Sequence, residues 1–240
     1  MLQGRGRLVR DTPGNDLIVL QILYSILYNI RNPRQPCEDS VTETARKPGR
    51  GRPRLFDPAE AIHVAQTLFH RAGYEGVSLT DLTGAIGITP PSFYAAFGSK
   101  AGLFREVLAR YRENDGVPFG AMLRPGRDMA EALGEVLEEA ARRYAADPQA
   151  RGCLVLAGCH ALEPDARAAA RTLQQAAIEL IRDFVAAERP DAAPAVANYM
   201  ATVTAGLSAE ARAGATPDAL LQVARDAASA LPMILARKPD

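Results

Sequence analysis

The chain has 240 residues, enough for one large domain or two small ones. Hydrophobic residues make up 48% of it, there is no tryptophan, and alanine is abundant, which favours helices over strands. Three cysteines at irregular spacing exclude a disulfide framework and fit a reducing compartment. No repeat of fixed period is present.

The net charge is zero, but it is unevenly distributed. Residues 1–115 hold 15 Lys and Arg against 12 Asp and Glu, whereas residues 116–240 hold 13 against 16, which gives +3 and −3. The basic excess is densest in residues 46–54, RKPGRGRPR. This stretch is able to neutralise phosphates, and the alternative is a solvated linker.

Residues 1–49 are expected to be an N-terminal extension, flexible or partly helical. Its apolar segment, residues 16–30, is too short to cross a bilayer, and no cleavage site for a signal peptide follows it. Three interpretations remain: an anchor, an extra helix, or translated sequence upstream of the true start; the last two are favoured. Residues 31–54 indicate a linker that ends in a basic arm.

Helix signals begin at Asp57, which is a natural N-cap, with Pro58 at the first helical position and Glu60 placed to complete a capping box. Gly73 is a natural stop. Between them the apolar residues share one helical face: Ala61, Ala65, Leu68, Phe69 and Ala72.

Two further short helices follow. Ser78 and Asp81 predict the start of one, which Gly87 ends. Thr89 caps the next, and the prolines 90 and 91 fall at its first two positions, where the N–H groups have no partner within the helix. Gly98 ends this helix and Ser99 caps another. Two such helices joined by a glycine-containing turn predict a helix-turn-helix, which places the second helix in the DNA major groove.

Residues 51–111 resemble the DNA-binding domain of TetR-family transcriptional regulators, and the opening GRPRLFD and the PPSFYAAFGSK run are similar to its AcrR-like branch. Residues 206–232 resemble the end of that branch's regulatory domain. The resemblance is carried by Phe69, Gly73-Tyr74, Ser78, Asp81-Leu82, Gly87-Ile88, Phe93-Tyr94, Phe97, Lys100 and Leu103-Phe104.

The resemblance implies a DNA-binding domain over residues 50–100 and roles for its side chains. Tyr94 and Lys100 are expected to clamp phosphates, as is Thr80. Three residues are expected to face base edges: Thr89, Pro90 and Ser92. Phe93 and Phe97 match positions that pack inward. The arginines of the arm are expected in a neighbouring minor groove, as in other helix-turn-helix proteins: Arg50, Arg52 and Arg54.

Two positions depart from the family pattern. Ala95 and Ala96 replace residues that form hydrogen bonds in many relatives, so base readout by this helix is expected to be sparse. Gly102 stands where relatives commonly have Glu, which removes a capping box and predicts a weaker helix start.

Residues 101–240 are predicted to be a helical regulatory domain, so that the whole fold is all-α. A helix over residues 100–113, a loop over 115–126 and a central buried helix over 153–162 are expected. Four later apolar faces predict further helices: Met129, Leu133, Val136, Leu137, Ala140 and Tyr144; Leu173, Ala177, Leu180, Ile181 and Phe184; Val196, Met200, Val203 and Leu207; and Leu220, Val223, Ala224, Ala227 and Leu231, the last after Thr216-Pro217-Asp218.

The resemblance further implies a cytoplasmic homodimer, paired through its last two long helices, that binds a palindromic operator and responds to an unidentified small molecule. Neither a cofactor nor a metal nor a membrane partner is expected. The candidate residues lining the effector pocket are Met129, Leu133, Tyr144, Leu156, His160 and Phe184, and plain core packing is the alternative for most of them.

Two other functions stay open. Cys153, Cys159 and His160 are the one constellation suited to a thiol- or metal-responsive regulator, although Cys153 and Cys159 lie about 240° apart around a helix. A membrane-associated interaction protein rests on residues 16–30 alone. An enzyme is not expected and no catalytic residue is assigned, because the three histidines are scattered and the sequence has neither a glycine-rich phosphate loop nor a His-Glu-x-x-His motif.

Overall fold

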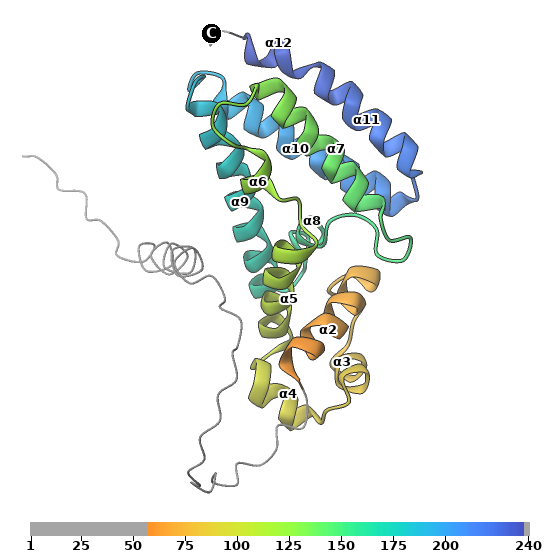
Figure 1. Cartoon of the computed structure of the whole chain (residues 1–240). Coiled ribbons are helices and arrows are strands. Elements are labelled where there is room, and N and C mark those ends of the chain that lie inside the picture. The colour runs from red at the N-terminus through yellow and green to blue at the C-terminus, as the bar shows by residue number, and fades with distance from the viewer. Residues whose placement is uncertain (1–56, 238–240) are drawn as a thin grey trace, which may run out of the picture. The chain divides into compact units, whose positions relative to one another are not determined.

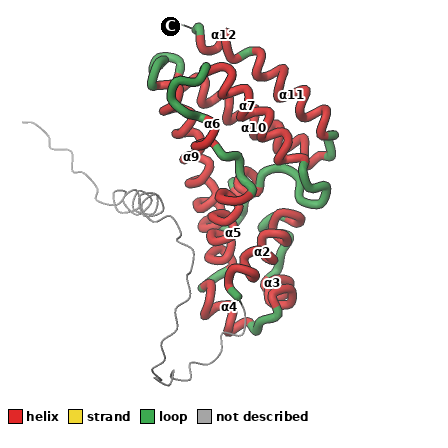
Figure 2. Tube along the Cα trace, viewed as in Figure 1, coloured by secondary structure: helices red, strands yellow, loops and turns green. Residues whose placement is uncertain are grey.

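The computed structural model describes residues 57–237. The chain divides into two units, residues 1–51 and 52–240, and all the described residues belong to the second. Figure 2 shows helices joined by loops, and residues 57–237 contain no strand, which confirms the all-α prediction. The apolar segment 16–30 and the three arginines of the basic arm lie outside the described residues. No helix within the described part of the chain is long and apolar enough to cross a membrane.

The helices follow one another closely along the chain (Figure 1). They are α2 (Pro58–Ala72), α3 (Leu79–Ile86), α4 (Pro90–Phe97), α5 (Lys100–Asn114), α6 (Phe119–Met122), α7 (Met129–Ala145), α8 (Leu154–Gly158), α9 (Pro164–Ala186), α10 (Ala193–Ala213), α11 (Pro217–Ser229) and α12 (Leu231–Leu235). We call α2 to α4 the head and the helices from α6 onward the body; α5 connects them.

Most of the predicted helix starts are present. The side chains of Asp57, Ser78, Thr89 and Thr216 each accept a backbone N–H from the first turn of the following helix. Around Asp57, the bond comes from the Ala59 N–H at 2.9 Å, and among the described residues no reciprocal bond from Glu60 completes the predicted capping box. The head therefore begins on a single cap bond.

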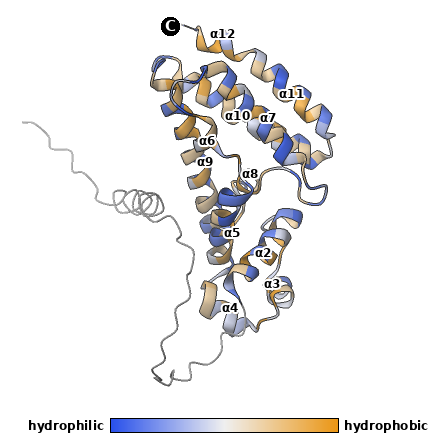
Figure 3. Cartoon of the chain, in the orientation of Figure 1, coloured by the Kyte–Doolittle hydropathy of each residue, from blue (hydrophilic) through white to orange (hydrophobic). Residues whose placement is uncertain are grey.

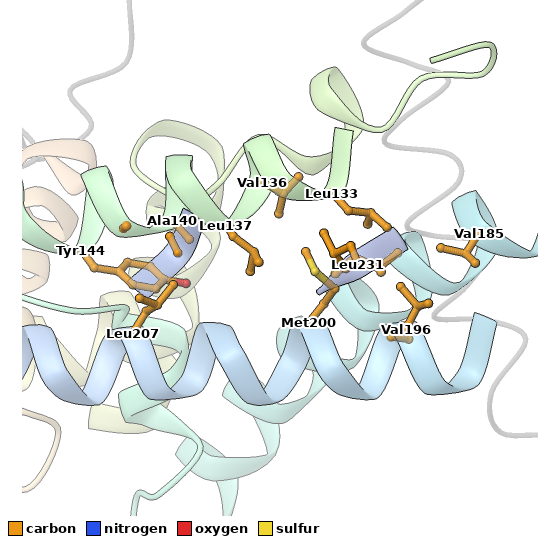
Figure 4. Packing of buried hydrophobic residues seen from close by; sticks show 14 of the residues in the cluster. Leu133, Val136, Leu137, Ala140, Tyr144, Val185, Val196, Met200, Leu207 and Leu231 are labelled. Atoms are coloured by element: carbon orange, nitrogen blue, oxygen red, sulfur yellow. The ribbon is translucent and has the colours of Figure 1, made fainter. Parts of the chain in front are cut away.

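The body is built around one apolar cluster, which we call the body cluster. Helices α7, α9, α10, α11 and α12 all contribute to it. Figure 4 shows Leu137 and Tyr144 of α7 on one side of it and Met200 and Leu207 of α10 on the other. Hydrophobic and hydrophilic residues alternate along these helices in Figure 3, as is typical of helices that bury one face.

A second apolar cluster, which we call the head cluster, spans the head, α5, α8 and the start of α9. At its centre, the Phe104 ring of α5 lies edge-on to Phe69 and Tyr74, at centroid distances of 5.0 and 4.9 Å. Leu154 of α8 and Ala166 of α9 belong to the same cluster. Head and body thus share a continuous core, so that the start of α9 is packed against the residues that position the head.

The body differs from its sequence-based description in several places, and Val223, predicted on the apolar face of α11, is 51% exposed. The predicted loop 115–126 contains the short helix α6. Leu180, expected on the buried face of α9, is exposed, and Ile178 packs against the cluster instead. The last predicted helix is interrupted at Ala230, so that Leu231 begins the separate helix α12.

The predicted central helix over residues 153–162 is wrong in length and burial. Only Leu154–Gly158 is helical, and Leu162 is 79% exposed. A Cβ on Gly158 would lie 2.9 Å from the Ala170 Cβ, so the glycine lets α8 pack closely against α9. Pro164 then opens α9 and holds Glu163 in an extended conformation, which prevents one continuous helix.

Candidate nucleic-acid interface

The start of α3 presents Thr80 to solvent. Ser78 and Asp81 form the predicted capping box: the Ser78 Oγ accepts the Asp81 N–H at 3.1 Å, and the Asp81 carboxylate accepts the Ser78 N–H at 2.8 Å. Leu82, on the opposite side of the helix, is fully buried. Thr80 is therefore held at the second position of a well-capped helix, where its hydroxyl and the free N–H groups face outward.

A tight corner joins α3 to α4. Gly87 adopts the left-handed conformation with φ 76°, and the N–H groups of Gly87 and Ile88 both donate to the Thr83 carbonyl. Ile88 packs against the head cluster, which fixes the direction in which the chain leaves the corner. Two short helices joined in this way form the helix-turn-helix that the sequence predicts.

The paired prolines open α4. Thr89 is its N-cap, and Pro90 and Pro91 occupy its first two positions, as predicted. The Thr89 Oγ1 accepts the Ser92 N–H at 3.4 Å and lies 3.0 Å from the Ser92 Oγ, so the two hydroxyls bond to each other. Two of the three residues predicted to face base edges, Thr89 and Ser92, are thus held together at the start of the helix.

The aromatic residues of α4 divide between two faces. Phe93 is fully buried, and Phe97 packs against the head cluster, as predicted for both. Tyr94 is 53% exposed, and its ring meets Phe93 edge-on at 5.7 Å. Phe93 and Phe97 therefore anchor α4, while the Tyr94 hydroxyl is presented to solvent.

The turn from α4 to α5 requires a residue without a side chain at position 102. Ser99 caps α5 by accepting the Gly102 N–H at 2.9 Å. A Cβ on Gly102 would lie 2.1 Å from the Phe97 carbonyl oxygen, which no side chain tolerates without a backbone shift. The glycine permits the close approach of α4 to α5. The prediction of a weaker start for this helix did not take that contact into account.

Lys100, the first residue of α5, lies beside an aromatic ring and two carboxylates. Its Nζ is 4.1 Å from the centroid of the Tyr74 ring, a cation–π contact. Partial burial lowers the Lys100 pKa, and the nearby carboxylates of Glu75 and Glu163 act in the opposite direction. The lysine is half-buried, so it is available to a phosphate only at the edge of this cluster.

Polar bonds connect the head to the body at two places. The Glu75 carboxylate accepts the Leu162 N–H at 2.7 Å, and the Tyr74 hydroxyl donates to the Glu163 carboxylate. Burial, followed by the bond to Glu163, raises the Tyr74 pKa well above its usual range, so the hydroxyl remains a donor. On α2, His70 Nε2 lies 3.0 Å from the Gly152 carbonyl oxygen.

The structure brings the predicted DNA-contacting residues of the head to neighbouring positions on α3, α4 and the start of α5. Thr80, Thr89, Pro90 and Tyr94 are exposed, and Ser92 and Lys100 are half-buried. Arg50, Arg52 and Arg54 lie outside the described residues.

Comparison with known proteins agrees with this geometry. The family model for bacterial regulatory proteins of the tetR family matches residues 61–107. The HTH-type transcriptional repressor BdcR of Escherichia coli (strain K12) is 45% identical over 185 residues, which cover 77% of this chain and 94% of BdcR. The HTH-type transcriptional repressor ComR of the same organism is 32% identical, covering 74% of this chain and 90% of ComR.

A solved structure extends the similarity to a DNA complex. A cysteine mutant of the TetR-family regulator CifR, complexed with a 26-bp double-strand operator DNA, is 37% identical to this chain. It matches with a TM-score of 0.67 over 75% of this chain and 100% of CifR. The chain belongs to the TetR family. It is a DNA-binding transcriptional regulator with an N-terminal helix-turn-helix, and like other regulators of the family it is a homodimer.

In this TetR-family chain, the last long helices leave an apolar groove uncovered. A cavity of about 340 Å³ lies between α10 and α11. It is lined by Val203, Gly206, Leu207, Glu210, Ala215, Ala219, Leu220, Val223 and Ala227. Val223 is 51% exposed there. These two helices are the ones expected to pair with a second subunit, and the surface is apolar enough to be buried.

The predicted effector residues do not all lie together. Leu133 and Tyr144 belong to the body cluster. Three more pack against it: Met129, Leu156 and Phe184. His160 is exposed in the turn after α8. Sequence reasoning also gave no sign of the groove between α10 and α11, because its lining residues read as two separate amphipathic helices.

The cysteines of the body are free, and neither is an activated thiol. Burial raises the Cys153 pKa, although backbone N–H groups and the hydroxyls of Tyr111 and Tyr144 act in the opposite direction. Burial also raises the Cys159 pKa, to about 11, and its thiol bonds to Gln174 Oε1 at 3.3 Å. Within residues 57–237, no group of His, Cys, Asp or Glu is placed to hold a metal ion.

Proposed function

We propose that the protein is a repressor that binds a roughly palindromic operator as a homodimer and leaves it when a small molecule binds the body. The exposure of Tyr94 on a helix that buried Phe93 anchors carries this proposal, because it fixes a hydrogen-bonding side chain on the outer face of the second helix-turn-helix helix. BdcR and ComR, both named repressors, support it. Such a regulator acts on DNA in the cytoplasm and needs no catalytic residue.

The two kinds of contact would be made by different residues. Tyr94, Lys100 and Thr80 bind phosphates and contribute equally on any DNA sequence. Thr89 and Ser92 face base edges, and Pro90 shapes the start of the helix beside them. Because the two hydroxyls bond to each other, one rotates toward a base only if that bond is given up or shared.

Little other base readout is available on α4. Ala95 and Ala96 are exposed but offer only methyl groups, which contact the methyl of a thymine. The basic arm would supply the remaining specificity by inserting its arginines into a neighbouring minor groove. These are the residues Arg50, Arg52 and Arg54.

The effector would act on the spacing of the two heads. An effector releases DNA only if it binds the DNA-incompetent arrangement more tightly than the competent one. The body cluster around Leu133 and Tyr144 is the proposed place for it, since α7 and α9 to α12 meet there and α9 continues down to the head. His160 would contribute only if the turn after α8 moved inward.

Selection from a random DNA pool tests the proposal. Purified wild-type protein should enrich a single site with two-fold symmetry. Thr89→Val or Ser92→Ala should alter the enriched sequence, whereas Tyr94→Phe should lower recovery of DNA and leave the sequence unchanged. Enrichment of no common site, or a changed site in Tyr94→Phe, would refute these roles. A panel of small molecules can then be screened for release of the selected DNA.

A covalent effector acting on Cys153 is the second candidate. Cys153 packs against both apolar clusters, that of the body and that shared with the head and α5. The raised pKa of the thiol leaves little thiolate at neutral pH, which lowers its reactivity. Alkylation of the folded protein decides between the two: release of DNA on modification, abolished in Cys153→Ser, would establish the thiol mechanism.

A further inference from the structure

The corner between α8 and α9 places the Glu163 carboxylate near Lys100, the lysine that is proposed to bind a DNA phosphate. Glu163 is the residue before α9, and its carboxylate accepts the Tyr74 hydroxyl from the head. Lys100 lies on the ring of that same tyrosine, with its Nζ 4.1 Å from the centroid. Glu163 and Glu75 both lie near enough to act on the charge of Lys100. The Tyr74 side chain thus joins the two groups: its ring contacts the Lys100 ammonium and its hydroxyl bonds the Glu163 carboxylate, which acts on the lysine charge from beyond ion-pair distance.

This cluster is held in place from both sides. Tyr74 is almost fully buried, stacks on Phe69 at 5.6 Å and meets Phe104 edge-on, so its ring cannot follow the lysine away from the core. On the body side, Glu75 accepts the Leu162 N–H. Two bonds in opposite directions therefore connect residues 74–75 of the head with residues 162–163 of the body.

DNA phosphate and the Glu163 carboxylate are both anions that act on the Lys100 ammonium. A phosphate bound by Lys100 would lie near the Glu163 carboxylate, and two anions at one cation repel each other. Glu163 is the N-cap residue of α9, a helix of 23 residues that packs against α10 at its other end. A shift of α9 would move this charge relative to the lysine (Figure 1).

We infer that Glu163 is a positioning residue that competes with DNA phosphate for the Lys100 ammonium, and that it thereby couples the position of α9 to the strength of DNA binding. The inference rests on the proposed phosphate contact of Lys100. It adds a specific site of control: the body weakens DNA binding by placing a carboxylate at Lys100, in addition to any change in the spacing of the heads.

Binding of the full-length protein to fluorescent, mixed-sequence duplex DNA at several salt concentrations tests this inference, because phosphate contacts do not depend on sequence. The variant is Glu163→Gln, which keeps the size and an oxygen acceptor for Tyr74 but removes the charge. The matched control is Asp165→Asn, which makes the same change in net charge two residues further along, where the side chain bonds neither Tyr74 nor Lys100. Each is also made in a Lys100→Met background, and thermal unfolding verifies folding.

We expect Glu163→Gln to tighten binding roughly two- to fivefold at low salt, as for removal of one surface charge pair. Asp165→Asn should change it less, and the gain from Glu163→Gln should vanish in the Lys100→Met background, since a coupling between the two residues appears only when both are present. An equal gain in both backgrounds, an equal gain in Asp165→Asn, or no gain would overturn the inference. If Lys100→Met alone leaves binding unchanged, the phosphate contact itself is wrong and the inference fails with it.

Discussion

Two glycines, one in α3 and one in α5, have opposite structural requirements. Gly84 lies in the middle of α3, and a Cβ there would meet no atom within 4 Å. Gly102 lies in the first turn of α5, where a Cβ would lie 2.1 Å from the Phe97 carbonyl oxygen. The first glycine costs helix stability without a packing benefit, and the second permits the turn that places α4.

Alanine at these two glycines should therefore act in opposite directions. Gly102→Ala should destabilise the protein by about 1–3 kcal/mol, as overpacking does. Gly84→Ala should stabilise it by about 1 kcal/mol, through helix propensity. Urea unfolding followed by circular dichroism measures both free energies. A Gly102→Ala variant as stable as the wild type would show that the close turn to α5 is not a constraint.

Elements of the head were more predictable than those of the body, for a physical reason. The start of α4 depends on Thr89, Pro90 and Pro91, and their preferences act within one turn of helix, so the sequence is sufficient to place it. Likewise, the apolar spacing of α7 is reproduced in its buried face. Capping residues and the spacing of apolar residues act over a few neighbouring positions, so both can be recognised in a single sequence.

Tertiary contacts decided the elements that were wrong. Nothing in the apolar run 153–162 indicates a helix of one turn. Helix α8 ends at Gly158, where the chain packs closely against α9, and Pro164 begins α9 as a separate helix. The contact of Tyr74 with Lys100 and Glu163 joins residues far apart along the chain, so no spacing rule could reveal it. The residues proposed to face DNA were assigned by family resemblance, because exposure alone does not distinguish them from other exposed residues.

His70 of α2, which is partly buried against the Gly152 carbonyl before α8, should make the stability of the fold decrease in acid. Burial is the main cause that lowers the His70 pKa; the bond to the Gly152 carbonyl acts against it, as do Asp115 and Asp147, whereas Arg212 acts in the same direction as burial. Its folded-state pKa lies below the unfolded value of about 6.5. Stability should therefore be complete above that pH and decline as pH falls toward the folded-state pKa.

The comparison of two variants measures this effect. His70→Gln should flatten the loss of unfolding free energy between about pH 6.5 and the lower folded-state pKa, because it removes the group that the unfolded chain protonates more readily. His63→Gln, at an exposed position of the same helix, should keep the wild-type slope. Parallel pH profiles for wild type and His70→Gln, from urea unfolding, would contradict the assignment.

At the scale of the whole molecule, the homodimer determines how the two heads meet DNA. The groove between α10 and α11 exposes Val223 among other apolar residues. A charge at the centre of a subunit interface is left unpaired and desolvated, which costs several kcal/mol. Val223→Glu should therefore shift the protein toward monomer in analytical ultracentrifugation. Leu162→Glu, at an apolar and even more exposed residue on the α8–α9 corner, should remain dimeric; loss of the dimer there instead would place the interface elsewhere.

The central claim is that the head grips the phosphate backbone through Tyr94 and Lys100, and the salt dependence of DNA binding measures it most directly. Wild-type protein and Lys100→Met are titrated with the same mixed-sequence duplex over a series of salt concentrations. Each lost phosphate contact lowers the slope of log K against log salt by about 0.9, so the variant dimer should lose about 2 units of slope together with affinity. An unchanged slope and affinity in Lys100→Met would contradict the account.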